Sequence, residues 1–599
     1  MLLTGFVCEW YSGPTFWIPE EALPPRNHLS HKRGRARGIR TEATVLVPGE
    51  KRCEPLGCDT RSHISMKDKT GAKTPNSKTA KHRNSGEGSL HATRREFLRT
   101  AAGASLALAG SPLAAWADHH GHPSPNSISY LDRRMYIHNM ELLAHFMPGH
   151  VRNGKMQLMS IGNRRYMFQQ GDVIDVSDVR KPQMFNKGGF EGGQVQVAYN
   201  KNLKKWILMT GAQAPITDST PEAPMGKYDD PHLDDKRKNY KGLRGVRFYD
   251  VSDPSKIVKL SEFSTGASGQ GTHRNYYDGG KYVYLDTAPD ETFIHQPSYF
   301  RQLVNGNMIV DASDPSSAKE VSMWWVPGSR KGEEAEYNKW IWSKLVPPKV
   351  VADQTPFAGL HGPVYVPKKL EDGGNRGYGA FGCNGFIILD LSDPTRQKEI
   401  GRFEPPPQYS GMGIAFHTIY CGILDRGFVL SNGETTNSDC NQVYLPNWVI
   451  DIRDEEHPLA VAQLPRPVPP PEAPYRDFCF KRGRFGAHNP PHLKAPGKPR
   501  QEFIAYSYFI AGLRCYDIGD LYKPEEVAYF IPPQGGDLKK FGSYDRTVDN
   551  VFIEWDRNII WTATDTGLYA LSCPNLGKSI LDPMAVAEWS LEKLNEGAP

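Results

Sequence analysis

One short sequence pattern recurs along the chain and constrains its fold more than any other feature. An apolar run ends in Asp, two further residues and a second Asp follow, and Pro comes soon after, as in RFYDVSDP at 247–254. Pro lacks the N–H that a sheet ladder needs, and Asp and Ser favour tight turns, so each copy predicts a strand that ends in a turn. The Asp that ends each strand recurs roughly every 60 to 80 residues, at Asp175, Asp250, Asp311, Asp390, Asp451 and Asp517.

A seventh, degenerate copy, GLYALSCP, ends the series at Gly567–Pro574. Repetition at this scale indicates stacked supersecondary units, and four short strands in each unit would make it the blade of a propeller. The predicted fold class is therefore all-β: a seven-bladed β-propeller with polar loop insertions and a disordered N-terminal extension. We expect the ring to close when a strand from residues 130–167 pairs with the last blade.

The amino-acid sequence of these repeats resembles the LVIVD-repeat family of β-propellers, and the resemblance covers nearly everything after about residue 150. This resemblance implies a propeller and does not indicate an activity. Selenium-binding proteins of the methanethiol oxidase type and carotenoid-cleaving oxygenases are similar only in architecture and in their axial histidines. That architectural similarity favours an oxidoreductase without naming a substrate.

The segment at 93–117, TRREFLRTAAGASLALAGSPLAAWA, is similar to a twin-arginine (Tat) signal peptide. It has an arginine pair, an apolar run too short for a membrane span and an A-x-A cleavage site at Ala115–Ala117. The resemblance implies that the Tat translocase exports the folded chain to the periplasm, beginning near Asp118 and without a membrane span. We expect residues 1–92 to be a disordered extension, produced by a start codon placed too far upstream, and 118–599 to form the propeller.

Charge and cysteine content argue against two classes of function. The formal net charge of +5 arises in the first 117 residues, and the slightly acidic remainder disfavours nucleic acid as a partner. The cysteines after residue 117 form no CxxC pair, so the sequence shows no zinc or dithiol redox motif. An even number of cysteines in an exported protein permits disulfides, but most of the six lie in or beside predicted strands, which favours buried free thiols: Cys383, Cys421, Cys440, Cys479, Cys515 and Cys573.

Four histidines occupy matching places in successive repeats, where the chain passes from the rim to the innermost strand of the next blade. They lie in the motifs GTHRNYY, GLHGPVYV, AFHTIY and GAHNPPH, as His273, His361, His417 and His488. In a propeller these places converge at one mouth of the central channel. Neutral imidazole binds Fe, Cu and Zn, so the pattern predicts one transition metal held by the four rings, with no acidic ligand evident. The adjoining polar residues are predicted to bind substrate: Arg274, Asn275 and Asn489.

Two functions are compatible with this pattern. One is a periplasmic metal-dependent oxidoreductase with a His-lined site at the channel mouth. The other is a non-catalytic LVIVD-type propeller that binds a protein or ligand, in which each histidine is structural and bonds to the neighbouring blade. The first requires the rings to converge on one point, whereas the second places each ring sideways against its neighbour. The matching places before the second and seventh blades carry Gln194/Gln196 and Asp549/Asn550.

Overall fold

The computed structural model describes residues 131–147, 155–214, 239–293, 304–340, 357–405, 414–436, 440, 442–535 and 547–582, together with the backbone of 218–220 and 223–227. The predicted extension (1–92) and signal peptide (93–117) lie outside the described residues. Within these ranges no helix combines the length and the apolar character that crossing a membrane requires.

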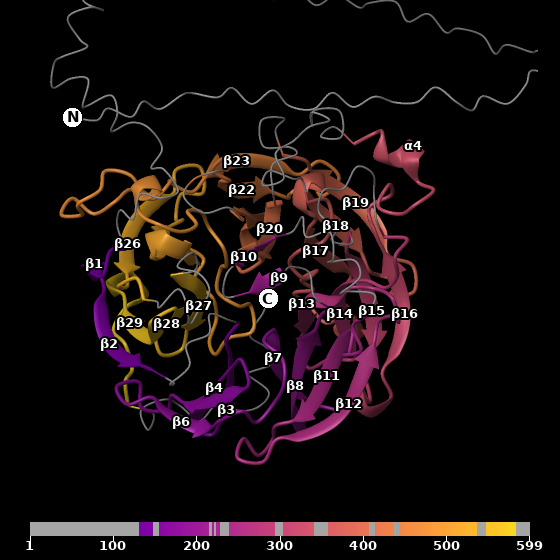
Figure 1. Ribbon diagram of the computed structural model, residues 1–599, viewed down its shortest axis with the longest axis horizontal. Coiled ribbons are helices and arrows are strands. Elements are labelled where there is room, and N and C mark those ends of the chain that lie inside the picture. The colour runs from indigo at the N-terminus through magenta and orange to yellow at the C-terminus, as the bar shows by residue number, and fades with distance from the viewer. Residues whose placement is uncertain are drawn as a thin grey trace, which may run out of the picture. The chain divides into compact units, whose positions relative to one another are not determined.

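Seven antiparallel sheets surround a central channel, and each is one blade of a propeller (Figure 1). From the channel outwards, the first three blades contain β3 (Gln157–Ile161), β4 (Arg164–Gln169), β5 (Asp172–Asp175) and β6 (Gln183–Asn186); β7 (Val195–Asn200), β8 (Lys205–Ala212), β11 (Gly245–Asp250) and β12 (Val258–Ser264); β13 (Gly271–Tyr277), β14 (Tyr282–Ala288), β15 (Gly306–Asp311) and β16 (Lys319–Trp324). The prediction of a seven-bladed all-β propeller is confirmed.

The remaining blades follow the same order with two irregularities. They contain β17 (Arg376–Ala380), β18 (Phe386–Asp390) and β19 (Lys398–Phe403); β20 (Ile414–Tyr420), β21 (Phe428–Glu434), β22 (Asn447–Asp451) and β23 (Leu459–Gln463); β24 (Phe503–Ser507), β25 (Leu513–Asp517), β26 (Glu525–Ile531) and β1 (Tyr136–His138); β27 (Val548–Glu554), β28 (Ile559–Thr564), β29 (Gly567–Ser572) and β2 (Glu141–Phe146). In the fourth and sixth blades an irregular segment takes the innermost position, beside β17 and β24.

Short elements connect or decorate the blades. They are the hairpin β9 (Asp218–Thr220) and β10 (Ala223–Lys227), the helix α4 (Glu334–Tyr337), and the 3₁₀ turns η3 (Pro315–Ser317), η6 (Leu370–Asp372), η7 (Gly382–Asn384), η8 (Leu424–Arg426), η9 (Phe478–Phe480), η10 (Phe509–Ala511) and η11 (Pro574–Leu576).

The repeated Asp residues end the third strand of six blades and shape the turn that follows. In each turn the Asp carboxylate accepts a hydrogen bond from the backbone N–H two residues later, over distances from 2.7 to 3.0 Å. The pairing between third and fourth strands shifts register just before each Asp. Such a bulge increases local twist, so every repeat turns its outer strand in the same way.

The N-terminal part of the described chain closes the ring. Strand β2 pairs with β29 and becomes the outermost strand of the seventh blade, as predicted. Strand β1 pairs with β26 and adds an outer strand to the sixth blade, with Tyr136 opposite Ile531. One segment therefore covers the edges of two neighbouring blades, which removes exposed strand edges from the point of closure.

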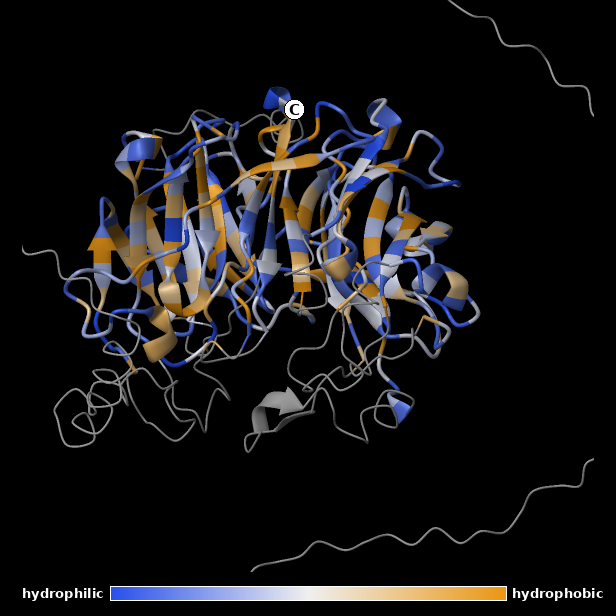
Figure 2. Cartoon of the chain, turned by 90° about the horizontal axis from the view of Figure 1, so that it is seen from above, coloured by the Kyte–Doolittle hydropathy of each residue, from blue (hydrophilic) through white to orange (hydrophobic). Residues whose placement is uncertain are grey.

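Apolar side chains fill the interfaces between blades. The largest cluster includes fully buried isoleucines from four consecutive blades: Ile309, Ile388, Ile450 and Ile504. Figure 2 shows apolar positions distributed along the strands over the height of the ring. Each blade thus depends on its neighbours for burial, as expected for a repeat architecture.

One cysteine pair departs from the prediction of free thiols. Cys440 and Cys479 form a disulfide with a Cα–Cα distance of 5.3 Å, a separation typical of such bonds. Neither residue lies in a strand: Cys440 is in the loop after β21 and Cys479 is in η9. The favoured expectation of free thiols was wrong for this pair, because it rested on cysteines that lie in or beside strands, whereas these two lie in loops that approach each other. The other four are buried free thiols, as expected: Cys383, Cys421, Cys515 and Cys573.

Candidate metal centre

The four predicted histidines come from consecutive blades and lie in a row at the channel. The ring centroids of His273 and His361 are 4.9 Å apart, those of His361 and His417 4.8 Å, and those of His417 and His488 5.0 Å. His273 is in β13 and His417 in β20, whereas His361 and His488 are in the irregular inner segments. These segments are held by backbone bonds from His361 N to Ala380 O (3.1 Å) and from His488 N to Ser507 O (2.8 Å).

Irregular pairing at the start of three innermost strands positions the polar side chains of the channel. The ladder shifts between Thr272 and Asn275 in β13, between Ile414 and Thr418 in β20, and between Val548 and Asn550 in β27. His273, Arg274, His417 and Asp549 lie within these interruptions. A bulge re-aims side chains and is common beside functional sites, so these residues need not follow the strand alternation.

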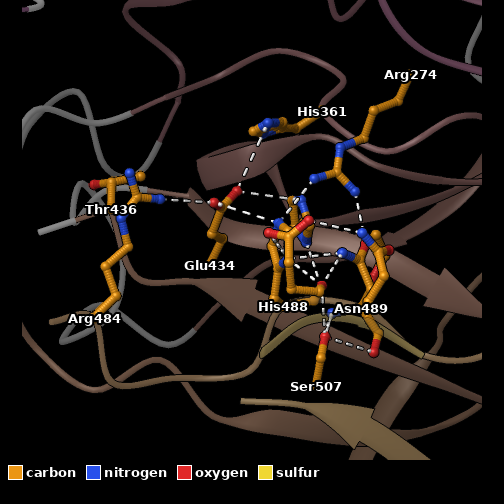
Figure 3. Close-up of polar contacts among 12 residues, drawn as sticks. Arg274, His361, Glu434, Thr436, Arg484, His488, Asn489 and Ser507 are labelled. Atoms are coloured by element: carbon orange, nitrogen blue, oxygen red, sulfur yellow. Dashed lines mark hydrogen bonds and ion pairs between the residues drawn. The ribbon is translucent and has the colours of Figure 1, made fainter. Parts of the chain in front are cut away.

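A buried carboxylate completes the row of histidines. Glu434, at the end of β21, is 5% exposed, and its Oε2 lies 3.2 Å from Nε2 of His417 and 3.8 Å from Nε2 of His361 (Figure 3). These three residues offer ligand atoms that all lie within 4.8 Å of one another. Within the described residues, the other such group contains the disulfide cysteines Cys440 and Cys479.

Glu434 was not predicted from the sequence, and no acidic ligand was evident there. The repeated histidines lie on the innermost strands, whereas Glu434 comes from the second strand of the fifth blade. A usable signal existed in FVLSNGE, an otherwise uncharged and fully buried strand that ends in a carboxylate. Burial of a carboxylate is costly unless a partner compensates it.

The hydrogen bonds of His417 fix where its proton lies. Its Nδ1 is 2.7 Å from the backbone oxygen of His488, and a carbonyl can only accept, so Nδ1 carries the hydrogen. Burial, with the nearby charge of Arg274, holds the pKa of His417 well below its usual value, so the ring is neutral. The lone pair on Nε2 therefore faces Glu434. Nε2 has no hydrogen-bond partner among the described residues, although the carboxylate oxygen is 3.2 Å away.

His361 has the same character. Its pKa is also well below the usual value, mainly because burial disfavours the charged form. Its Nδ1 has no hydrogen-bond partner within the part of the chain that is described, and its Nε2 points toward Glu434. Both rings are therefore neutral imidazoles, the form that binds metals.

The two outer histidines of the row have other partners. Nε2 of His488 accepts a hydrogen bond from Arg274 at 2.9 Å, and its Nδ1 is 2.7 Å from the backbone oxygen of Asp549. Nδ1 of His273 is 3.1 Å from Oε1 of Gln213. Among the described residues, His361 and His417 are thus the two histidines of the row whose Nε2 faces Glu434 without another hydrogen-bond partner. The ligand set of four histidines stays a prediction.

Comparison with known families agrees with the repeats of the blades. Residues 303–324 and 374–404 match the family model described as the LVIVD repeat. The chain carries LVIVD repeats. The first match contains β15 and β16 and the second contains β17, β18 and β19, so each includes the two strands on either side of an Asp turn, in the third and fourth blades. No curated protein matches the chain.

Solved structures similar to this propeller share low sequence identity with it. Raptor from Chaetomium thermophilum is 11% identical with a TM-score of 0.41, over 73% of this chain and 29% of that one. The β-propeller domain of Cps50 (Swd1) from Myceliophteria thermophila is 9% identical with a TM-score of 0.36, over 70% and 99%. Streptogramin B lyase is 10% identical with a TM-score of 0.33, over 74% and 99%. The chain therefore spans less than a third of the Raptor chain.

The residues predicted to bind substrate separate into two groups in the structure. Arg274 and Asn489 lie together, with Arg274 donating to Oδ1 of Asn489 at 2.7 Å (Figure 3). Asn275 instead bonds within the third blade, donating to Thr272 at 3.0 Å and accepting from the backbone of Asp286 at 3.3 Å. Its contacts stabilise the bulge that carries His273 and Arg274. Lys155, which the sequence reading did not select, also donates to Oδ1 of Asn489, at 2.8 Å.

Proposed function

We propose that this LVIVD propeller is a metal-dependent oxidoreductase in which His361, His417 and Glu434 hold one transition-metal ion. The observation that carries the proposal is the contact between His417 and Glu434. A neutral imidazole presents a lone pair to a carboxylate oxygen 3.2 Å away, in a site closed to solvent. Two lone pairs at that distance repel each other unless a proton or a metal ion lies between them.

The remaining contacts suit metal ligation. A histidine that binds a metal usually donates its other N–H to a carbonyl or carboxylate, and His417 does so to the backbone of His488. Arg484 is 3.2 Å from Oε1 of Glu434, which leaves Oε2 as the oxygen nearest the two imidazoles. Direct ligation at about 2.0–2.2 Å places donor atoms about 3–4.5 Å apart. The distances from Oε2 of Glu434 to Nε2 of His417 (3.2 Å) and to Nε2 of His361 (3.8 Å) fall within that interval.

Two imidazoles and one carboxylate are the donor set of non-haem Fe(II) oxygenases, which makes iron the first choice and zinc or copper the other outcomes. An Fe(II) ion supplies redox chemistry and open coordination positions for a substrate. In this chain His361, His417 and Glu434 would hold the ion, and Arg484 would balance the charge of Glu434. His488, fixed between Arg274 and Asp549, would orient the side chains around it.

The proposal includes export to the periplasm by the Tat translocase. It is supported by the arginine pair Arg94–Arg95 and the A-x-A site before Asp118. Tat export carries folded proteins, so the metal would be inserted in the cytoplasm before translocation.

Metal analysis tests the proposal directly. Protein folded in the cytoplasm and purified without chelators should contain close to one iron, copper or zinc ion per chain by plasma mass spectrometry. His361→Ala, His417→Ala and Glu434→Gln should each remove most of it while circular dichroism still shows a folded propeller. His457→Ala is the matched control, because His457 is an exposed histidine paired with Asp454 at 3.1 Å. Full metal content in Glu434→Gln, or metal-free wild-type protein that metal salts do not restore, would overturn the proposal.

A second function, a non-catalytic binding propeller, is favoured by one observation. His417 and His488 each bond through Nδ1 to the backbone of the next blade, which is what purely structural histidines would do. In that case the contact between Glu434 and His417 would serve the packing of the blades alone. Every His→Ala change would then lower the melting temperature, and none would change metal content.

A further inference from the structure

Two cations lie beside the candidate metal centre without a carboxylate in ion-pair contact. Lys155 and Arg274 both donate to Oδ1 of Asn489, at 2.8 and 2.7 Å. Within the described chain, neither has a carboxylate oxygen within 4.0 Å. One neutral amide oxygen is thus shared by two positive groups. Nε of Arg274 has no hydrogen-bond partner among the described residues.

Cations in such surroundings normally have a counter-charge. Arg274 is 5% exposed, and burial lowers the pKa of both Arg274 and Lys155, because a charge loses its hydration there. Glu434 and Asp549 favour the charged forms from beyond ion-pair distance. A buried charge without a paired partner costs free energy, and the Arg274 guanidinium keeps its charge, so an anion bound beside Arg274 and Lys155 would be stabilised.

The charges of the site leave room for an anion. Three cations, Lys155, Arg274 and Arg484, lie near two carboxylates, Glu434 and Asp549. A further carboxyl group, Asp286, has a pKa well above its usual value because of burial, and it accepts a hydrogen bond from Asn305. Arg484 is paired with Glu434 at 3.2 Å, so Glu434 is already balanced, and a divalent metal ion would add further positive charge beside Arg274.

Arg274 and Lys155 lie close to the candidate metal centre. Arg274 reaches from Asn489 to Nε2 of His488, and that nitrogen is 3.6 Å from Oε1 of Glu434 (Figure 3). Lys155 meets the same Asn489 oxygen and is partly buried, whereas Arg274 and Asn489 are buried. A ligand that displaced Asn489 from the two cations would lie next to the metal ligands.

We propose that Lys155, Arg274 and Asn489 form a subsite for the carboxylate group of a small anionic substrate. This inference rests on the proposed function in one respect, that the bound anion would lie beside a metal ion. Lys155 and Arg274 would bind the anion whether or not a metal is present. Arg presents two parallel N–H groups that match a carboxylate, and Lys adds a point charge. Asn489 would turn its amide N–H groups to the ligand. Arg274 and Lys155 would contact the carboxylate of the substrate directly and orient it.

The test is titration of metal-free protein with sodium acetate at constant ionic strength, followed by calorimetry and by the melting temperature. Wild-type protein should bind acetate saturably and melt at a higher temperature with it. Lys155→Gln and Arg274→Gln should each weaken acetate binding by about tenfold to hundredfold, the effect of losing a hydrogen bond to a charged group. Lys205→Gln is the matched control, because Lys205 is paired with Asp250 at 2.7 Å at another blade's turn, and it should bind acetate as wild type does.

The outcomes separate this inference from the proposed function. Protein that binds metal but shows no saturable acetate binding would overturn the subsite and leave the metal centre standing. Protein that binds acetate through Lys155 and Arg274 but no metal would overturn only the oxidoreductase. Tighter binding of inorganic phosphate than of acetate would overturn the assignment to a carboxylate. If Arg274→Gln does not fold, the comparison of Lys155→Gln with Lys155→Arg decides, because Arg at 155 should retain binding and Gln should not.

Discussion

The rim turns and the channel ends of the blades carry repeated residues in very different surroundings. At the rim, six Asp residues make the same hydrogen bond to the backbone N–H two residues later. At the channel, four histidines in matching positions differ in their side-chain partners, although His417 and His488 both contact a backbone carbonyl of the next blade through Nδ1. His273 contacts Gln213, His488 contacts Arg274, His417 contacts a carbonyl and Glu434, and Nδ1 of His361 has no hydrogen-bond partner in the described chain.

The difference separates structural from functional repetition. A residue that has the same partner in every copy is sufficiently explained by local folding, because the same turn needs the same bond. A residue whose position repeats while its partners differ is not explained in that way. The rim and the channel should therefore respond differently to substitution, and four changes test this in order of decreasing effect.

The largest effect should come from deleting residues 131–147, which removes β1 and β2. The seventh blade would lose its outer strand and expose the edge of β29, and the ring would not close. We expect no cooperative thermal transition by circular dichroism. The control is Leu459→Thr at an exposed position of β23, which should change stability by less than about 0.5 kcal/mol. A deleted protein that melts like wild type would show that the rim does not depend on this closure.

Removing the disulfide should have the next largest effect. Cys440 lies in the loop after Glu434, and Cys479 precedes Arg484, so the bond restrains two segments that meet at Glu434. Replacing both cysteines with Ser should lower the free energy of unfolding by about 2–4 kcal/mol. Reductant should destabilise wild-type protein and leave the double variant unchanged in denaturant unfolding. Equal unfolding curves for wild-type protein with and without reductant would contradict the expectation.

The pH dependence of the free energy of unfolding should show that the buried Lys481 loses its proton more easily than an exposed lysine. Burial lowers its pKa to about 7, and it is fully buried, donating to the backbone oxygen of Ile510 at 2.9 Å. Between pH 7 and the ordinary lysine pKa the unfolded chain binds the extra proton. Stability should therefore rise with pH there, by up to about 1.4 kcal/mol per pH unit. Lys481→Met should remove this slope in unfolding measurements from pH 6 to 9. An unchanged slope would mean that Lys481 stays charged in the folded protein.

Single substitutions at the rim turns should have the smallest effects. Asp311→Ala and Asp390→Ala each remove one hydrogen bond to a backbone N–H, at 2.9 Å in both. Each should lower the free energy of unfolding by about 0.5–1.5 kcal/mol and leave metal content unchanged. In contrast, His361→Ala should lower metal content more than His273→Ala. Loss of metal on substitution of either Asp would end the distinction between rim and channel.

Much of the fold followed from the sequence because it repeats. The strand that ends at Asp390 and the pairing of an N-terminal strand with β29 were predicted, since turn residues and ring closure have local or topological causes. The gathering of His273 and His361 was predicted for the same reason, from their shared place in each repeat.

The residues that complete the candidate site could not be predicted from repeats. Glu434 occurs in one blade only, and Lys155 lies before the first blade, so neither has a counterpart that would mark it. The bulge at His273 and Arg274 depends on pairing across strands. The disulfide joins Cys440 and Cys479 across two insertions whose approach is set by the packing of neighbouring blades.

X-ray absorption at the edge of the bound metal tests the central claim most directly. Wild-type protein loaded with Fe(II) should show two imidazole nitrogens, with the other donors being oxygens, at about 2.0–2.2 Å. Glu434→Gln should lose the metal or change its oxygen shell, and His273→Ala should leave the spectrum unchanged. A spectrum with four imidazoles would place His273 and His488 in the ligand set and contradict the assignment of His361, His417 and Glu434.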